Sequence, residues 1–124
     1  MTDILFKEES YKIIGVCFEV HKILGYGFLE TVYKDALEIE FTKLGIAFAR
    51  EKPYAIRYKE QVLKHSFIAD FIVYDSIILE VKTSKSIVDP HIKQTLNYLK
   101  ASGLKLGLVL NFGKPSFESH RVIF

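Results

Sequence analysis

The sequence has a single cysteine, Cys17, and no long apolar run. One cysteine excludes an intrachain disulfide framework and a zinc site built from several cysteines. Because the uninterrupted apolar runs span only a few residues, no segment is predicted to cross a membrane. The first twelve residues carry acids early and lack an apolar signal-peptide core, so a cytoplasmic protein is expected.

The sequence also lacks the short motifs of several common enzyme classes. It has no nucleophile elbow, no phosphate-binding glycine-rich loop followed by Lys-Ser or Lys-Thr, and no dinucleotide-binding fingerprint. The four histidines show no zinc-type spacing with one another or with Cys17. These absences leave other residue types, such as carboxylates and lysines, as the candidates for a functional site.

The charge is nearly balanced, with 17 basic and 15 acidic side chains and a formal net charge of +2. Residues 64–124 hold eight basic and five acidic side chains, so the second half is mildly basic. This balance permits nucleic-acid binding without indicating it. A length of 124 residues with 49% hydrophobic content suits one compact domain, and residues 1–124 are predicted to form it.

Three helices are predicted from the spacing of apolar residues. These residues recur at steps of three and four in 13–24 and again in about 28–44, and a glycine follows each run. Asp89 and Pro90 predict the start of a third helix, with the aspartate as its N-cap and the proline in its first position. This helix should run to about Ser102.

The remaining segments alternate apolar and polar residues or are continuously apolar, which predicts strands. Pro53 either interrupts the first strand or places it at a sheet edge. The predicted order is α-α-β-β-β-α-β-β, and the fold class is α/β in the α+β sense, a mixed sheet flanked by helices. The predicted strand regions are 46–58, 62–74, 77–83, 104–112 and 117–124.

Three charged residues, Asp70, Glu80 and Lys82, interrupt otherwise apolar strands. Charges at such positions are costly unless they are paired or bind a metal ion. Glu80 and Lys82 are two apart and share a strand face. Two carboxylates could hold a hard cation such as Mg²⁺, and the lysine could orient a water or stabilise charge on a phosphate. A buried salt bridge, or a strand edge with both charges in water, remains the alternative.

The connection between the two strands decides whether Asp70 can meet Glu80. If Asp75-Ser76 were a two-residue hairpin loop, Asp70 would lie opposite Val81 and Glu80 would face the other way. Placing the two carboxylates together requires a loop of odd length or a bulge in one strand. We predict one of these features.

A second group of candidates lies on the predicted helices. Gly27-x-x-Glu30-x-x-Tyr33 opens the second helix and places Glu30 and Tyr33 on one face. Gln94 and Tyr98 share a face of the third helix. The alternatives are a favourable interaction of Glu30 with the helix dipole, core packing of the tyrosines with a bonded hydroxyl, and an exposed polar role for Gln94.

Together these motifs resemble the GxxExxY protein family, a branch of the PD-(D/E)xK nuclease-like superfamily. Two departures from the family pattern are Tyr26, where proline is usual, and Ile68, where arginine often precedes the Ala-Asp pair. The matching blocks are Gly27-Phe28-Leu29-Glu30-Thr31-Val32-Tyr33, Ala69-Asp70, Glu80-Val81-Lys82, Gln94-x-x-x-Tyr98-Leu99-Lys100 and Leu110-Asn111-Phe112-Gly113.

The resemblance implies a restriction-endonuclease-like core and a set of roles. Asp70 and Glu80 would ligate Mg²⁺ or Mn²⁺, with Glu30 as a third acidic partner from the helix. Lys82 would position the attacking water. The residues that line the pocket or touch substrate would be Gln94, Tyr98 and Tyr33.

The leading hypothesis is therefore a divalent-metal-dependent nuclease that hydrolyses nucleic-acid phosphodiesters with metal-activated water. DNA is favoured over RNA as the partner, and a homodimer would double the modest basic surface. The alternative is a non-catalytic module of the same fold that binds nucleic acid or protein.

Overall fold

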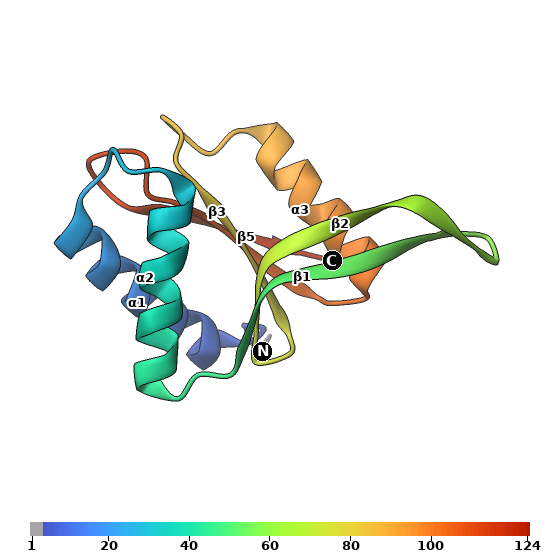
Figure 1. Cartoon of the computed structure of the whole chain (residues 1–124), viewed down its shortest axis with the longest axis horizontal. Coiled ribbons are helices and arrows are strands. Elements are labelled where there is room, and N and C mark those ends of the chain that lie inside the picture. Colours follow the sequence, from blue (N-terminus) through green and yellow to red (C-terminus); the bar gives the residue numbers. More distant parts are fainter. Residues whose placement is uncertain (1–3) are drawn as a thin grey trace.

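The computed structural model describes residues 4–124, and the helices and strands follow one another in the predicted order. The α+β fold class is confirmed (Figure 1). The helices are α1 (Lys7–Leu24), α2 (Glu30–Leu44) and α3 (Asp89–Ser102). The strands are β1 (Phe48–Tyr58), β2 (Gln61–Val73), β3 (Ile77–Lys82), β4 (Leu106–Asn111) and β5 (Glu118–Ile123).

The five strands form one mixed sheet in the order β1-β2-β3-β4-β5. The β3–β4 pair is parallel and the other neighbours are antiparallel, so α3 is the crossover helix between two parallel strands. Buried side chains of α1 and α2 pack on one face of the sheet and those of α3 on the other (Figure 1). Cys17 is fully buried in the first of these cores.

Glycines mark the ends of two helices, whereas proline lies inside an edge strand. Pro53 does not interrupt β1, which runs through it as an edge strand, so the edge alternative holds. Gly25 and Gly45 follow α1 and α2 with φ of 70° and 68°, a conformation that favours glycine. Asp89 is the first residue of α3 rather than its cap, because Val88 takes the extended cap conformation.

The long β1–β2 hairpin changes face part of the way along its length. Phe71 packs in the core beneath α1 and α2, whereas Phe67 and Ala69 pack against α3. Regular alternation would place all three on one face. The change occurs at Glu51 and Asp70, which are absent from the register that runs from Phe48 to Ala55, and Glu51 has a φ of 54°. A separate register shift lies farther along the hairpin, between Ala55 and Arg57. The hairpin beyond this point faces α3 and projects past the sheet (Figure 1).

Gly107 lets α3 approach the sheet closely. A Cβ atom at this position would lie 2.5 Å from Cγ2 of Thr95, whose hydroxyl donates to the His91 carbonyl at 3.0 Å. A threonine in a helix has little χ1 freedom with which to move away. We expect Gly107→Ala to lower the free energy of unfolding by about 1–3 kcal/mol in denaturant titrations.

The matched double variant, Gly107→Ala with Thr95→Ser, removes the offending methyl group and keeps the hydroxyl. We expect it to recover most of the loss caused by Gly107→Ala alone. Equal stability of the single and double variants would show that this contact is not what limits side-chain size at Gly107.

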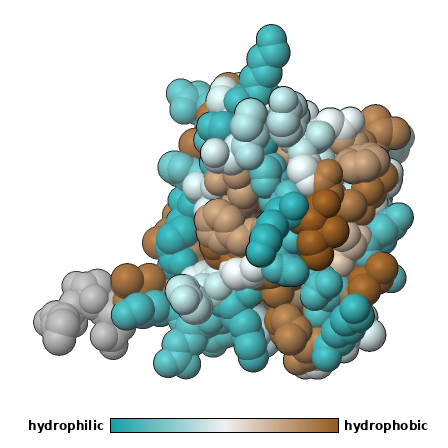
Figure 2. Space-filling view, turned by 90° about the vertical axis from the view of Figure 1, so that its left-hand side faces the viewer, coloured by the Kyte–Doolittle hydropathy of each residue, from teal (hydrophilic) through white to brown (hydrophobic). Residues whose placement is uncertain are grey.

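Several apolar side chains of α1 remain at the surface. Tyr11 is 83% exposed, Phe18 56% and Ile23 68%. Figure 2 looks onto the side where α1 lies and shows hydrophobic groups among hydrophilic ones rather than one continuous apolar face. Within residues 4–124, no helix combines the length and apolarity that crossing a membrane would need.

Candidate functional site

The connection between β2 and β3 has the odd length that the carboxylate pair requires. Val73 pairs with Ile77, which leaves the three residues Tyr74–Ser76 as the loop. Tyr74 and Asp75 take up the reversal with φ of 56° and 54°. The register then places Asp70 next to Glu80, as predicted.

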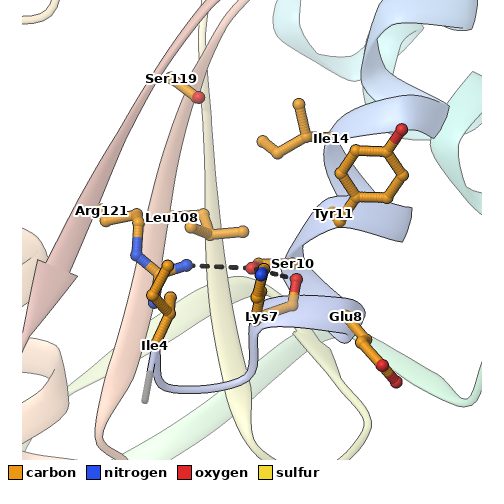
Figure 3. A pocket seen from close by; sticks show the side chains of 9 residues that line it. All are labelled: Ile4, Lys7, Glu8, Ser10, Tyr11, Ile14, Leu108, Ser119 and Arg121. Carbon is orange, nitrogen blue, oxygen red and sulfur yellow. Dashed lines mark hydrogen bonds between the residues drawn. The ribbon is translucent and has the colours of Figure 1, made fainter. Parts of the chain in front are cut away.

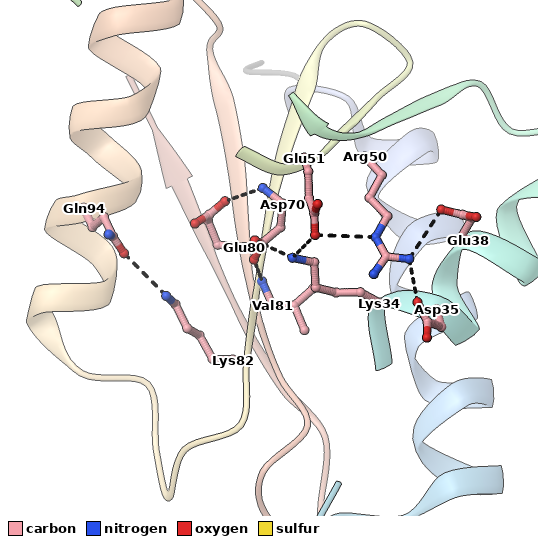
Figure 4. A network of polar contacts seen from close by, with 10 residues as sticks. All are labelled: Lys34, Asp35, Glu38, Arg50, Glu51, Asp70, Glu80, Val81, Lys82 and Gln94. Carbon is pink, nitrogen blue, oxygen red and sulfur yellow. Dashed lines mark hydrogen bonds and ion pairs between the residues drawn. The ribbon is translucent and has the colours of Figure 1, made fainter. Parts of the chain in front are cut away.

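Asp70 and Glu80 are joined through the backbone where the β2–β3 ladder ends (Figure 4). The Asp70 N–H donates to Oε2 of Glu80 at 3.1 Å. The Val81 N–H donates to Oδ2 of Asp70 at 2.8 Å. Each carboxylate therefore takes the place of a ladder acceptor in the neighbouring strand, which fixes both groups between β2 and β3.

Burial makes the charge of Glu80 costly. Its side chain is almost completely buried, with a relative exposure of 4% for the residue. Burial first, and the negative charge of Asp70 second, raise the pKa of Glu80 from 4.5 to about 8. The hydrogen bond from the Asp70 backbone and the positive charges of Lys82 and Lys34 oppose this shift only in part.

Lys34 is a member of the site that the sequence motifs did not reveal. Its Nζ lies 3.1 Å from Oδ1 of Asp70 and 3.2 Å from Oε1 of Glu51, and its side chain is only 9% exposed. Burial lowers the pKa of Lys34, but hydrogen bonds and charges from Asp70 and Glu51 outweigh that effect and raise it overall. The available signal was its position one helical turn after Glu30 on the same face.

Arg50 forms further ion pairs next to Lys34 and Glu51. Its Nη1 lies 2.7 Å from Oδ1 of Asp35 and 3.4 Å from Oε1 of Glu38, both on α2. Its Nε lies 3.8 Å from Oε1 of Glu51. The ion pairs connect α2 to β1 and keep Glu51 next to Lys34 (Figure 4).

Lys82, Gln94 and Tyr98 lie on the α3 side of the sheet. The ammonium group of Lys82 donates to Oε1 of Gln94 at 3.4 Å (Figure 4). Burial, followed by the charges of Glu80 and Asp70, raises the pKa of Tyr98. The electrostatic influence of both carboxylates thus reaches the surface of α3 that carries Tyr98.

The structure separates Tyr33 and Glu30 from this group. Tyr33 is fully buried, its hydroxyl donates to the Gly25 carbonyl at 2.7 Å, and its ring stacks on Phe112 at 4.8 Å. It therefore has a packing role and offers no surface to a substrate. Glu30 is exposed in the first turn of α2, and no hydrogen bond or ion pair joins it to Asp70 or Glu80.

Two carboxylates, rather than three, form the centre of the candidate site. Among residues 4–124, no three histidine, cysteine, aspartate or glutamate side chains lie close enough together to hold a metal ion. The participation of Glu30 as a third ligand stays a prediction. Asp70 and Glu80 still supply the oxygen donors that Mg²⁺ and Mn²⁺ prefer.

A separate cavity lies between the start of α1 and the β4–β5 part of the sheet (Figure 3). Its volume is about 530 Å³, and its lining is mainly apolar. Arg121 closes one side by donating to Oγ of Ser10 at 2.9 Å and to the Leu5 carbonyl at 2.6 Å. Because Glu8 is its only carboxylate among the described residues, this cavity lacks the paired acids of the Asp70 site.

Comparison with known proteins agrees with this fold. A family model described as the PD-(D/E)XK nuclease superfamily matches residues 7–122. The fold is similar to the crystal structure of SSO0001, with a TM-score of 0.60 and 20% sequence identity. That match covers 95% of this chain, which spans 60% of the SSO0001 chain. No curated protein shows significant sequence similarity.

Proposed function

Because the chain belongs to the PD-(D/E)XK nuclease superfamily, we propose that it hydrolyses nucleic-acid phosphodiester bonds with the help of Mg²⁺ or Mn²⁺. The observation that carries this proposal is the contact of Asp70 with Glu80 where β2 and β3 part, with Lys82 on the same strand as Glu80. We propose DNA rather than RNA as the substrate, and residues 1–124 as one nuclease-like domain that could act as a homodimer.

The donor set suits a hard divalent cation. The carboxylates of Asp70 and Glu80 lie together in a poorly hydrated place, where their repulsion contributes to the raised pKa of Glu80. A divalent cation between them would relieve that repulsion. Lys34 now occupies Oδ1 of Asp70, so it would compete with the cation for this oxygen.

Different residues of the site would bind the metal ion and assist the reaction. Asp70 and Glu80 would hold the metal ion, which when bound supplies a Lewis acid for the phosphodiester and lowers the pKa of water. Lys82, held by Gln94, would orient the attacking water or stabilise negative charge that develops on the phosphate. Lys82 is therefore needed for catalysis but not for holding the metal.

The test separates metal binding from cleavage. We expect wild-type protein to bind Mn²⁺ in calorimetric titrations and to cleave labelled DNA when Mn²⁺ or Mg²⁺ is present. Lys82→Ala should bind Mn²⁺ with similar affinity and lose cleavage by about 100-fold or more. Lys85→Ala removes the same charge from an exposed position in the next loop and should behave as wild type.

Two outcomes would count against the proposal. Cleavage that persists in Lys82→Ala would remove this lysine from the mechanism. Wild-type protein that binds DNA without cleaving it at millimolar Mn²⁺ would favour the non-catalytic binding module instead.

A further inference from the structure

A groove opens between the β1–β2 hairpin and α3, on the face of the sheet that α3 covers. Its volume is about 530 Å³, and residues of β1, β2 and α3 line it. Two of them, Arg57 and Lys100, are exposed cations, and Asn97 adds an exposed amide. No carboxylate occurs in the lining contributed by the described residues.

The elements on both sides of the groove are basic beyond the lining itself. Residues 52–66 of the hairpin carry four basic side chains and one acidic side chain, Glu60. Helix α3 adds Lys93 and Lys100 against Asp89. This local excess contrasts with a net charge of only +2 for the chain, so the hairpin and the helix that line the groove are more basic than the chain as a whole.

The groove leads to the carboxylate site along one face of α3. Ala101 and Tyr98 line the groove, and Gln94 continues the same face at the i, i+4, i+7 spacing. Gln94 accepts the hydrogen bond from Lys82. The stretch from 101 to 94 is about 10 Å of helix, roughly three steps along one DNA strand.

Stacked aromatic rings give the groove a rigid floor. The Phe67 ring lies 4.0 Å from that of Tyr98 with an interplanar angle of 4°, and 5.2 Å from that of Tyr54. This stack joins β1, β2 and α3, so the hairpin and the helix hold a constant separation. A groove of fixed width with cations and no acids suits a polyanion.

We propose that this groove holds the phosphate backbone of the nucleic acid, with Arg57 and Lys100 contacting phosphates a few nucleotides from the bond cleaved at Asp70 and Glu80. The proposal rests on the proposed function for the identity of the polymer. It extends that function by assigning substrate binding to the hairpin and to α3, away from the metal-binding carboxylates. Because the contacts are to phosphates, they should be independent of base sequence.

Binding without metal tests the groove separately from catalysis. We would measure the affinity of a fluorescent DNA oligonucleotide, single- and double-stranded, by anisotropy in EDTA over a range of salt concentrations. The double variant Arg57→Ala/Lys100→Ala should bind at least about tenfold more weakly at low salt. The slope of log K against log salt should fall in magnitude by about two, one for each lost phosphate contact.

Matched variants distinguish loss of these contacts from loss of charge or fold. Lys43→Ala removes an exposed cation from α2, on the opposite face of the sheet, and should leave affinity and salt slope unchanged. Arg57→Lys/Lys100→Arg keeps both charges and should restore most of the affinity. An unchanged thermal transition and unchanged Mn²⁺ binding would show that the double alanine variant is folded with its carboxylate site intact.

The results separate the two proposals. Wild-type affinity and salt slope in the double alanine variant would overturn the groove assignment, whether or not the protein cleaves DNA. Equal losses in Lys43→Ala would overturn it too, because binding would then follow overall charge. Weakened binding confined to the groove variants, in a protein that never cleaves, would support the groove and overturn the nuclease proposal.

Discussion

Replacing Glu80 by glutamine should make the metal-free protein more stable and, at the same time, remove the Mn²⁺ binding that we propose. Glutamine keeps the shape of the side chain and an oxygen that can accept the hydrogen bond from the Asp70 N–H. It removes a negative charge that is almost completely buried beside a second carboxylate. A neutral amide also fails to replace a carboxylate as a ligand for a hard cation.

The stability gain should depend on pH in a defined direction. The pKa of Glu80 is about 8 in the folded protein, above its ordinary value of 4.5. The unfolded chain therefore loses this proton at lower pH than the folded chain, and wild-type stability falls as pH rises from about 4.5 to about 8. One proton accounts for at most about 1.4 kcal/mol per pH unit. The advantage of Glu80→Gln should thus reach a few kcal/mol near pH 8.

Urea titrations of both proteins at several pH values, with EDTA present, measure this difference. Glu19→Gln makes the same chemical change at an exposed position of α1 and should shift stability by less than about 0.5 kcal/mol at every pH. In calorimetry, Glu80→Gln should give no saturable heat with Mn²⁺ up to millimolar concentration. A variant that loses stability in parallel with wild type as pH rises would show that Glu80 is ionised in the folded protein without penalty.

The pairing of Asp70 with Glu80 could be predicted because it depends on local rules. Side chains alternate along a strand, so the length of one loop decides whether two residues on adjacent strands meet. The charged residues inside apolar strands also indicated which two positions to compare across the strands. The three-residue loop Tyr74–Ser76 met the condition without any need to know the rest of the fold.

The contacts of Lys34 depend on non-local packing and could not be predicted in the same way. They require α2 to pack on the sheet so that Lys34 lies next to Asp70, and they require the side chain of Glu51 to point toward Lys34. Glu51 points toward Lys34 where the hairpin changes face. Its φ is positive, a conformation usual for glycine or asparagine, so a glutamate at this position gave no sign of it in the sequence. Periodicity identifies the buried face of a helix but not the residue on the facing strand.

A substitution of Asn111 should also change stability strongly, because its side chain joins segments that are distant in the sequence. All four hydrogen-bonding positions of its fully buried amide are used. Oδ1 accepts from the N–H groups of Ser84 and Gly113, both at 3.0 Å. Nδ2 donates to the Ser84 carbonyl at 2.9 Å and to Oε1 of Glu118 at 3.0 Å. The amide thus ties the loop after β3 to the loop after β4.

This connection holds the loop that joins two parts of the candidate site. The Ser84 loop runs between Lys82, at the end of β3, and α3, which carries Gln94. Glu118 also accepts from the Ile87 N–H at 2.7 Å, so both ends of the loop are held. The hydrogen bond from Asn111 is the leading cause of the lowered pKa of Glu118. We therefore expect Asn111 to help position Lys82 and Gln94.

Asn111→Asp should destabilise the protein by about 3–5 kcal/mol at neutral pH and reduce the proposed cleavage with it. An oxygen would replace Nδ2 and face both the Ser84 carbonyl and the Glu118 carboxylate, which leaves a buried charge opposed by two acceptors. Thermal and denaturant unfolding measure the loss. Asn97→Asp, the same change at an exposed position of α3, should cost less than about 0.5 kcal/mol. Comparable stability of the two variants would mean that the loop after β3 can move away from residue 111, so that Asn111 would not position Lys82.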